Sequence, residues 1–319
     1  MTEWALALGG VAGFVFVAGC SSSSSSPGMA APAADAGDDS GPPPYVGGQL
    51  DAFAIAVDGT NVYWTDETST GAVVKMPIAG GTPVTLASSQ NEPYGIAYDK
   101  TNVYWTDYGG GTVMSVPIAG GKATTLATGQ GAPWSVVVDK QNVYWTTQTG
   151  GSVMSVPIGG GTPTTLASAQ MSPIGIAVDA TSVYWTDDTG GTVMSVPLAG
   201  GMPATQASGE SRPYNMTVDA TSVYWVDNVE PGSVVKVPLA GGTTTTLASG
   251  QTDPYGLAID STAVYWTNAD GTIMSVPLAG GTPKTVISGQ DSPQGIAVYS
   301  TSLYWTNFGA DTLATITPK

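Results

Sequence analysis

The chain has 319 residues, with 24 acidic and 8 basic side chains, one cysteine and no histidine, and its formal net charge is −16. The lack of histidine excludes Ser-His-Asp and Cys-His catalysis, and with a single cysteine it also excludes zinc sites built on these two residue types. Arg212 is the only arginine, so the sequence excludes an extended surface that reads nucleic-acid phosphates.

The first twenty residues are typical of an export signal. Residues 4–18 are mostly Ala, Gly, Val, Leu and Phe, and this run is shorter than the roughly 20 residues that span a bilayer. It ends in Val17-Ala18-Gly19-Cys20, which resembles the lipobox of bacterial lipoproteins, although the usual basic residue before the apolar run is absent. The resemblance implies that residues 1–19 are a cleaved signal peptide and that a lipidated Cys20 holds the exported protein at the outer membrane or cell surface. In the alternative interpretation, Cys20 is an ordinary thiol of the leader.

The segment that follows is predicted to be a flexible tether. Residues 21–44 are rich in Ser, Pro, Gly and Ala, and Met29 is their only large apolar side chain. Such a segment cannot bury enough surface to offset the entropy lost on ordering. With Cys20 as its lipidated end, a tether over residues 20–44 would reach roughly 25–30 Å from a membrane.

The rest of the chain, residues 45–319, is a repeat with a period near 40 residues. The pair Tyr-Trp begins at positions 63, 104, 144, 184, 224, 265 and 304. Each repeat contains four short runs of β-branched and aromatic residues, bounded by Gly, Pro, Asn and Asp, and no stretch has helical periodicity. Four antiparallel strands in every repeat predict an all-β chain folded as a single β-propeller with seven four-stranded blades.

The count of turns predicts how the propeller closes. A Gly-Gly turn between the third and fourth strands occurs six times, against seven Tyr-Trp pairs, and the chain ends just after the seventh third strand. One fourth strand is therefore missing at the C-terminus. Residues 45–48 align with a fourth strand, so we expect this N-terminal segment to complete the last blade and cover its edge.

The motif at the Tyr-Trp pairs resembles a known repeat. Tyr-Trp-Thr-Asp is intact at positions 63–66, 104–107 and 184–187 and altered in the other four copies, where Val226 replaces Thr in one of them. Residues 45–319 look like the YWTD propeller of low-density-lipoprotein-receptor proteins and their bacterial relatives. The resemblance implies that the motif residues are mainly structural. It also implies six blades, the usual number in that family, as the alternative to seven.

Candidate binding residues lie in two sets of loops that share one face of a propeller. These are the loops that enter the first strand and those that join the second and third strands, and their residues vary while the framework repeats. The entering loops bring Phe53, Tyr94, Trp134, Ile174, Tyr214, Tyr255 and Gln294 to equivalent positions, and the other loops contribute Tyr108, Asp188, Asn228, Asp270 and Phe308.

Aromatic rings mixed with carboxylates and amides suit a carbohydrate or an extended peptide. The predicted ligand-binding residues are therefore Tyr94, Trp134, Tyr214, Tyr255, Tyr108, Phe308 and Arg212. In the alternative interpretation, the aromatic rings pack on one another and cap the central channel. Arg212 either pairs with an anionic group of the ligand or forms a surface ion pair beside Glu210.

Two further sets recur in nearly every repeat and are interpreted as turn-capping residues. They are Gln90, Gln130, Gln170, Glu210, Gln251 and Gln290, and Asp58, Asp99, Asp139, Asp179, Asp219 and Asp260. The adjacent carboxylates of Asp187 and Asp188 are candidate Ca²⁺ ligands, but no loop has the residue spacing of a dedicated calcium site. We therefore expect neither a metal site nor a cofactor.

The sequence thus predicts a lipid-anchored, monomeric propeller of the bacterial envelope that binds a glycan, a peptide or an envelope protein without catalysis. The acidic charge makes nucleic acid an unsuitable partner. One alternative is a carboxylate-dependent glycosidase or lyase on the loop side of the propeller, which requires two carboxyl groups about 5–10 Å apart. Another is a purely structural surface protein.

Overall fold

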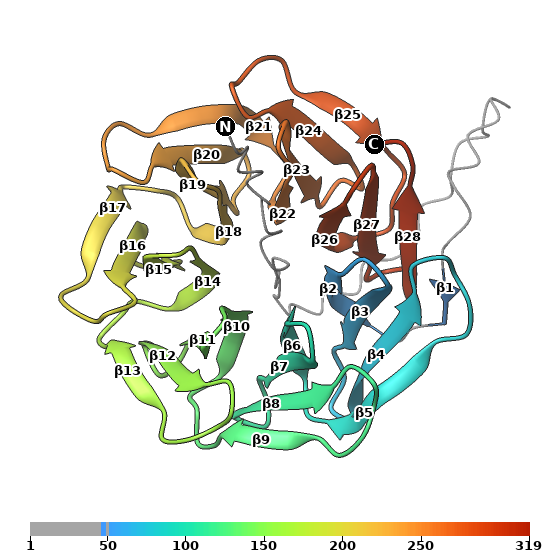
Figure 1. Cartoon of the computed structure of the whole chain (residues 1–319). Coiled ribbons are helices and arrows are strands. Elements are labelled where there is room, and N and C mark those ends of the chain that lie inside the picture. The colour runs from blue at the N-terminus through green and yellow to red at the C-terminus, as the bar shows by residue number, and fades with distance from the viewer. Residues whose placement is uncertain (1–45, 49–50) are drawn as a thin grey trace, which may run out of the picture.

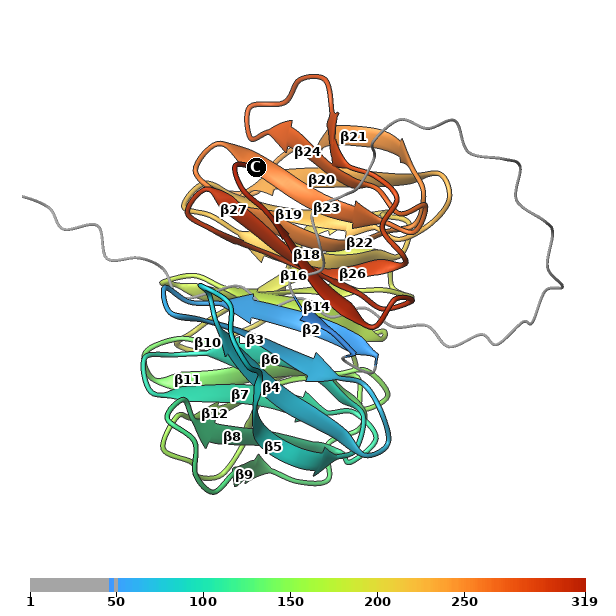
Figure 2. The same cartoon turned by 90° about the vertical axis from the view of Figure 1, so that its right-hand side faces the viewer.

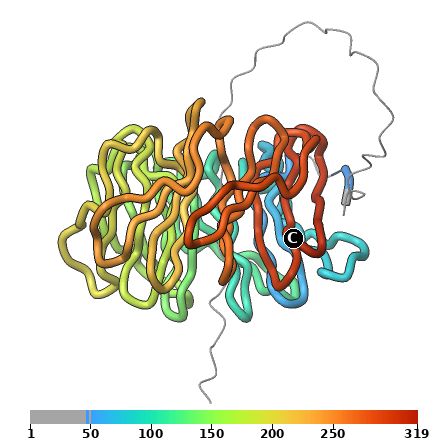
Figure 3. Tube along the Cα trace, turned by 90° about the horizontal axis from the view of Figure 1, so that it is seen from above, coloured from blue at the N-terminus to red at the C-terminus, as the bar shows by residue number. Residues whose placement is uncertain are grey.

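The computed structural model describes residues 46–48 and 51–319, which form seven four-stranded antiparallel sheets around a central axis (Figure 1). Figure 2 and Figure 3 show the same ring of blades from the side. The all-β prediction and the count of seven blades are confirmed, and the six-blade alternative is wrong. No helix long and apolar enough to cross a membrane occurs in the described ranges. The predicted signal peptide, Cys20 and the tether lie outside them.

The blades follow the chain order. Blade 1 contains β2 (Ala52–Val57), β3 (Asn61–Asp66), β4 (Gly71–Pro77) and β5 (Val84–Gln90). Blade 2 contains β6 (Pro93–Tyr98), β7 (Asn102–Asp107), β8 (Thr112–Pro117) and β9 (Thr124–Ala127). Blade 3 contains β10 (Pro133–Val138), β11 (Asn142–Thr147), β12 (Ser152–Pro157) and β13 (Thr164–Ala167). Blade 4 contains β14 (Pro173–Val178), β15 (Ser182–Asp187), β16 (Thr192–Pro197) and β17 (Ala204–Ser208). Blade 5 contains β18 (Pro213–Val218), β19 (Ser222–Asp227), β20 (Gly232–Pro238) and β21 (Thr245–Gln251). Blade 6 contains β22 (Pro254–Ile259), β23 (Ala263–Asn268), β24 (Ile273–Pro277) and β25 (Lys284–Ile287). Blade 7 contains β26 (Pro293–Tyr299), β27 (Ser302–Asn307), β28 (Thr312–Ile316) and β1 (Val46–Gly47).

The turn between the first and second strands is held by its aspartate. Asp58 Oδ1 accepts hydrogen bonds from the backbone N–H groups of Thr60 and Asn61, and its Oδ2 accepts the Tyr63 hydroxyl at 2.7 Å. The same bonds recur through blade 6, which confirms the turn-capping role of these aspartates. An Asp side chain that bonds the backbone two residues ahead stabilises a tight turn.

The tryptophan of the motif fills the space between neighbouring blades. All seven of these side chains have an exposed fraction of 0%. In five blades the indole N–H donates to a glutamine Oε1 that precedes the blade, as Trp105 does to Gln90 at 3.0 Å. The Nε2 group of each of these glutamines also donates to the backbone carbonyl two residues earlier, so the glutamines hold their own turns, as predicted, and in addition tie consecutive blades together.

The motif threonine joins the innermost strands of adjacent blades. The Thr106 hydroxyl accepts the Gly95 backbone N–H at 2.9 Å and donates to the Trp134 carbonyl at 2.6 Å. The strands approach so closely that a Cβ on Gly95 would lie 2.7 Å from that carbonyl oxygen. The same bridge is made by Thr65, Thr146, Thr186, Thr267 and Thr306.

Blade 5 forms this bridge with a different residue. Val226 stands in place of threonine and has no hydroxyl group. Asn215, at the position of Gly95, carries a side chain whose Nδ2 donates to the Tyr255 carbonyl at 3.0 Å. The bond to the next blade is thus retained, because an amide on the first strand replaces a hydroxyl on the second.

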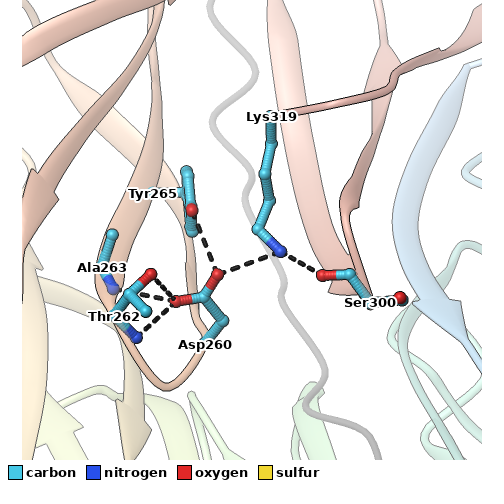
Figure 4. A network of polar contacts seen from close by, with 6 residues as sticks. All are labelled: Asp260, Thr262, Ala263, Tyr265, Ser300 and Lys319. Atoms are coloured by element: carbon cyan, nitrogen blue, oxygen red, sulfur yellow. Dashed lines mark hydrogen bonds and ion pairs between the residues drawn. The ribbon is translucent and has the colours of Figure 1, made fainter.

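The N-terminal strand closes the ring as predicted. Val46 pairs with Leu313 and Gly47 with Thr312, which places β1 on the edge of β28. The C-terminus ties blades 6 and 7 together (Figure 4): Lys319 Nζ lies 3.0 Å from Asp260 Oδ2 in blade 6 and also donates to the Ser300 carbonyl of blade 7. The Lys319 side chain is only 9% exposed, so the last residue of the chain is packed into the fold.

Candidate functional site

The loops that enter each first strand and the loops that join the second and third strands lie at the same end of the blades. Pro93 pairs with Asp107 at this end of blade 2, while Asn102 pairs with Pro117 at the opposite end, and the other blades have the same register. We call the first end the loop face. The opposite end, with the loops between the first and second and between the third and fourth strands, is the turn face.

The predicted aromatic residues come together on the loop face. Tyr94 is the hub, with ring centroids 4.7 Å from Phe53, 4.6 Å from Tyr108 and 4.8 Å from Trp134. Trp134 contacts Tyr214 at 6.3 Å, and Tyr214 contacts Tyr255 at 6.2 Å. Phe308 joins the group through Phe53 at 6.3 Å. We call these seven residues the aromatic cluster.

Burial divides the aromatic cluster in two. The side chains of Phe53, Tyr94, Trp134 and Tyr214 are buried, and their mutual contacts are those expected of a cap over the channel. Tyr108, Tyr255 and Phe308 are partly exposed, so a molecule on the loop face can reach them. Tyr108 stacks on Tyr94 and donates its hydroxyl proton to Gln148 Oε1 at 3.1 Å.

Glu67 belongs to this group but was not among the predicted residues. It directly follows β3, at the position that Tyr108 and Phe308 occupy after their own strands. The Tyr94 hydroxyl donates to its carboxylate. Burial raises the pKa of Glu67 to about 7, and the nearby Asp51 and Glu92 carboxylates raise it further against the effect of the Tyr94 hydrogen bond. Aligning the loops one residue after the motif would have identified it.

The motif carboxylates lie at the same end of the blades. Burial raises the pKa of Asp66 to about 7 and that of Asp107 to about 6. Both groups accept the indole N–H of their own strand, Asp66 from Trp64 at 3.0 Å and Asp107 from Trp105 at 3.1 Å. Each carboxylate therefore holds the tryptophan side chain of its own strand.

Arg212 lies at the blade 4–blade 5 boundary, away from the hub of the aromatic cluster. Its Nε donates to Asp188 Oδ1 at 3.0 Å, with the Arg212 side chain 51% exposed and Asp188 10% exposed. The ion pair therefore connects neighbouring blades, whereas the sequence had suggested Glu210 as the partner. In the part of the chain that the structure describes, no three Asp, Glu, His or Cys side chains form a group that could hold a metal ion.

Comparison with known proteins adds information on the fold alone. No family model matches the chain, and no curated protein matches it. The solved structures that resemble it include virginiamycin B lyase from Staphylococcus aureus, with a TM-score of 0.72, 12% identity, and coverage of 81% of this chain and 92% of that chain.

The chain also resembles the structure of a catalytically inactive form of that lyase with quinupristin, in which alanine replaces one histidine. The TM-score is 0.71, the identity is 13%, and the match covers 82% of this chain and 92% of that chain. A chain in a nidogen–laminin complex has a TM-score of 0.54, 22% identity, and coverage of 62% of this chain and 82% of that chain. At these identities the likeness extends to architecture only. The chain is a seven-bladed β-propeller built from YWTD-like repeats.

Proposed function

We propose that the protein is a lipid-anchored, non-catalytic binding module whose ligand sits on the loop face over the aromatic cluster. The observation that carries this proposal is the combination of partly exposed rings and a partly buried carboxylate at one place. Tyr108 stacks on Tyr94, and Tyr94 donates to Glu67, so a flat apolar surface and a hydrogen-bonding group are presented together. Such combinations are common in sites that bind sugars and peptides.

The composition supports binding rather than lyase chemistry. The similar S. aureus lyase is inactive when one histidine is replaced by alanine. This chain contains no histidine, so its residues cannot reproduce a step that needs an imidazole group. The two proteins therefore share a fold but not that catalytic group, and a shared fold does not by itself imply a shared function.

A carboxylate-dependent glycosidase is the second candidate, and one observation favours it. Burial raises the pKa of Glu67 to about 7, the Glu92 carboxylate lies near it, and glycoside hydrolysis uses two carboxyl groups that flank the scissile bond. Hydrolysis of peptidoglycan fragments or other glycans by the wild type, and its loss in Glu67→Gln, would establish the enzyme. Binding of the same glycans without cleavage supports the binding module.

Thermal melting of the full chain in detergent tests the proposed function. The ligands are neutral glycans, peptidoglycan fragments, peptides and Ca²⁺, each at several concentrations. A ligand present at 100 times its Kd adds about 2.7 kcal/mol to the folded state and should raise the Tm by several degrees. Tyr108→Ala should abolish the shift, while Tyr299→Ala, at the turn-face end of β26, serves as the matched control. A shift that both variants retain would contradict a site on the loop face.

The anchor is tested separately. Cells that express the full chain are labelled with a fatty acid that carries an alkyne, and the membrane fraction is collected. The wild type should carry label and sediment with membranes, and Cys20→Ser should lose both properties. Label or membrane retention in Cys20→Ser would contradict lipidation at this residue.

A further inference from the structure

The charges of the propeller are segregated between its two faces. Six aspartates cap turns on the turn face, and the remaining fourteen carboxylates of residues 51–319 lie in the loops of the loop face or at the strand ends beside them. All seven lysines lie on the turn face or in the strand halves next to it. Arg212 is thus the only cationic side chain on the loop face.

The segregation leaves the loop face with a net negative charge, because its carboxylates outnumber its one cationic side chain, Arg212, which pairs with Asp188. Burial raises the pKa of Glu67 and of Tyr108, and nearby carboxylates raise both further: Asp51 and Glu92 act on Glu67, and Glu92 acts on Tyr108. Like charges held near one another repel, and a cationic partner relieves that repulsion when it binds. The surface therefore complements a molecule that carries several positive charges.

The centre of the face has the geometry to receive a cationic side chain. The partly exposed Tyr108 ring is stacked on Tyr94, next to the Glu67 carboxylate with which Tyr94 is hydrogen-bonded. A Lys ammonium or Arg guanidinium gains from the face of an aromatic ring and from a carboxylate at the same time. Such a pairing would also lower the pKa of Glu67 toward its ordinary value.

Trp134 supplies an independent sign of a ligand. Its side chain is 4% exposed, and Nε1 has no hydrogen-bond partner among the described residues. A buried N–H group without an acceptor costs free energy. The indole ring makes an edge contact with Tyr108, with centroids 5.3 Å apart, and Tyr108 begins the glycine-rich loop that continues through Gly109 and Gly110. A bound segment whose backbone carbonyl meets the indole edge beside Tyr108 would supply that acceptor while Tyr108 stays stacked on Tyr94.

We propose, on the basis of the binding function above, that the loop face docks an extended Lys- or Arg-rich segment of a partner protein, with one cationic side chain between Tyr108 and Glu67. A polypeptide supplies both the positive charges and a carbonyl acceptor for Trp134. The tether of this chain does not fit, because residues 20–44 include Asp35, Asp38 and Asp39 and no basic residue.

Fluorescence anisotropy with the full chain in detergent tests the proposal. The probe is a labelled, end-blocked peptide of five Ala-Lys repeats, and the comparison peptide has five Ala-Glu repeats. We expect the Lys peptide to bind at least about tenfold more tightly than the Glu peptide at low ionic strength, and to weaken as salt is added. Glu67→Gln and Tyr108→Ala should each weaken binding about fivefold or more.

Asp179→Asn is the matched control, because it removes the same charge from the turn face and keeps an oxygen that can cap the turn. Equal weakening in Asp179→Asn and Glu67→Gln would mean that only net charge matters, and it would overturn the proposal. So would full competition by spermine, which has charge but no carbonyl groups. Self-association of the chain that the Lys peptide reverses would identify a second copy as the occupant and likewise overturn it.

The result also separates this inference from the proposed function. If a neutral glycan raises the Tm in a Tyr108-dependent manner while the Lys peptide does not bind, the binding module stands and the cationic partner is wrong. If neither ligand binds, both are wrong for these ligand classes.

Discussion

Replacing Glu67 with glutamine should stabilise the protein at neutral and alkaline pH. In the folded state the pKa of Glu67 is about 7, against 4.5 for the ordinary group, because the side chain is partly buried near Asp51 and Glu92. The folded protein therefore holds this proton more tightly than the unfolded chain does. Between pH 4.5 and 7 the folded state binds more protons, so stability falls as the pH rises through this window and is lowest above it.

The size of the effect follows from the shift in pKa. A difference from 4.5 to about 7 corresponds to roughly 3 kcal/mol in full, and partial solvent exposure reduces the expected value to about 2 kcal/mol. Glutamine cannot ionise, and its Oε1 still accepts the Tyr94 hydroxyl. Relative to the wild type, Glu67→Gln should gain about 2 kcal/mol more at pH 8 than at pH 5.

Urea unfolding at several pH values between 5 and 8 measures this difference. The comparison of variant and wild type at each pH isolates Glu67 from the other carboxylates with raised pKa values. Glu230→Gln makes the same chemical change at an exposed loop residue and should alter stability by less than about 0.5 kcal/mol at every pH. An equal effect of Glu67→Gln at pH 5 and pH 8 would refute the desolvation of Glu67.

Three further predictions concern contacts that hold the blades together. Asn215→Gly should lower the free energy of unfolding by about 1–2 kcal/mol, because it removes the hydrogen bond to the Tyr255 carbonyl, and adding Val226→Thr should restore most of that stability. A double-mutant cycle measured in urea that shows no coupling between the two positions would contradict the replacement of the threonine hydroxyl by the Asn215 amide. Lys319→Ala should lower the free energy of unfolding by about 1 kcal/mol at pH 7. Burial alone would raise the pKa of Asp260, but hydrogen bonds from Thr262, Lys319 and backbone N–H groups hold it at about 2. The difference in Tm between this variant and the wild type should therefore shrink as the pH falls below 3.8 and be lost below pH 2. Deleting residues 1–48 should uncover the edge of β28, lower the Tm and cause association that grows with protein concentration, whereas a monomer of unchanged Tm would argue against a role for β1.

The repeat makes most of the architecture predictable from the amino-acid sequence. Strand positions follow from short local patterns, such as the Asp that caps its own turn and the Pro that ends the third strand, and these depend on residues close together in the sequence. The mismatch between six Gly-Gly turns and seven Tyr-Trp pairs predicts the closing strand, because an unpaired edge in a ring must be covered. The placement of Tyr94, Trp134 and Tyr214 on one face also follows from the repeat, because equivalent positions in successive blades lie at the same end of the propeller.

Contacts between blades could not be predicted in the same way. The sequence alone determined that each repeat is a four-stranded blade, that seven of them follow one another, and that the N-terminal segment closes the last. Only the tertiary structure decided that Glu67 meets Tyr94, that Asp188 pairs with Arg212, and that Asn215 replaces the missing hydroxyl at Val226. The physical reason is that these partners are far apart in the sequence and sit on different strands, or on adjacent blades, whose separation and angle no local pattern specifies.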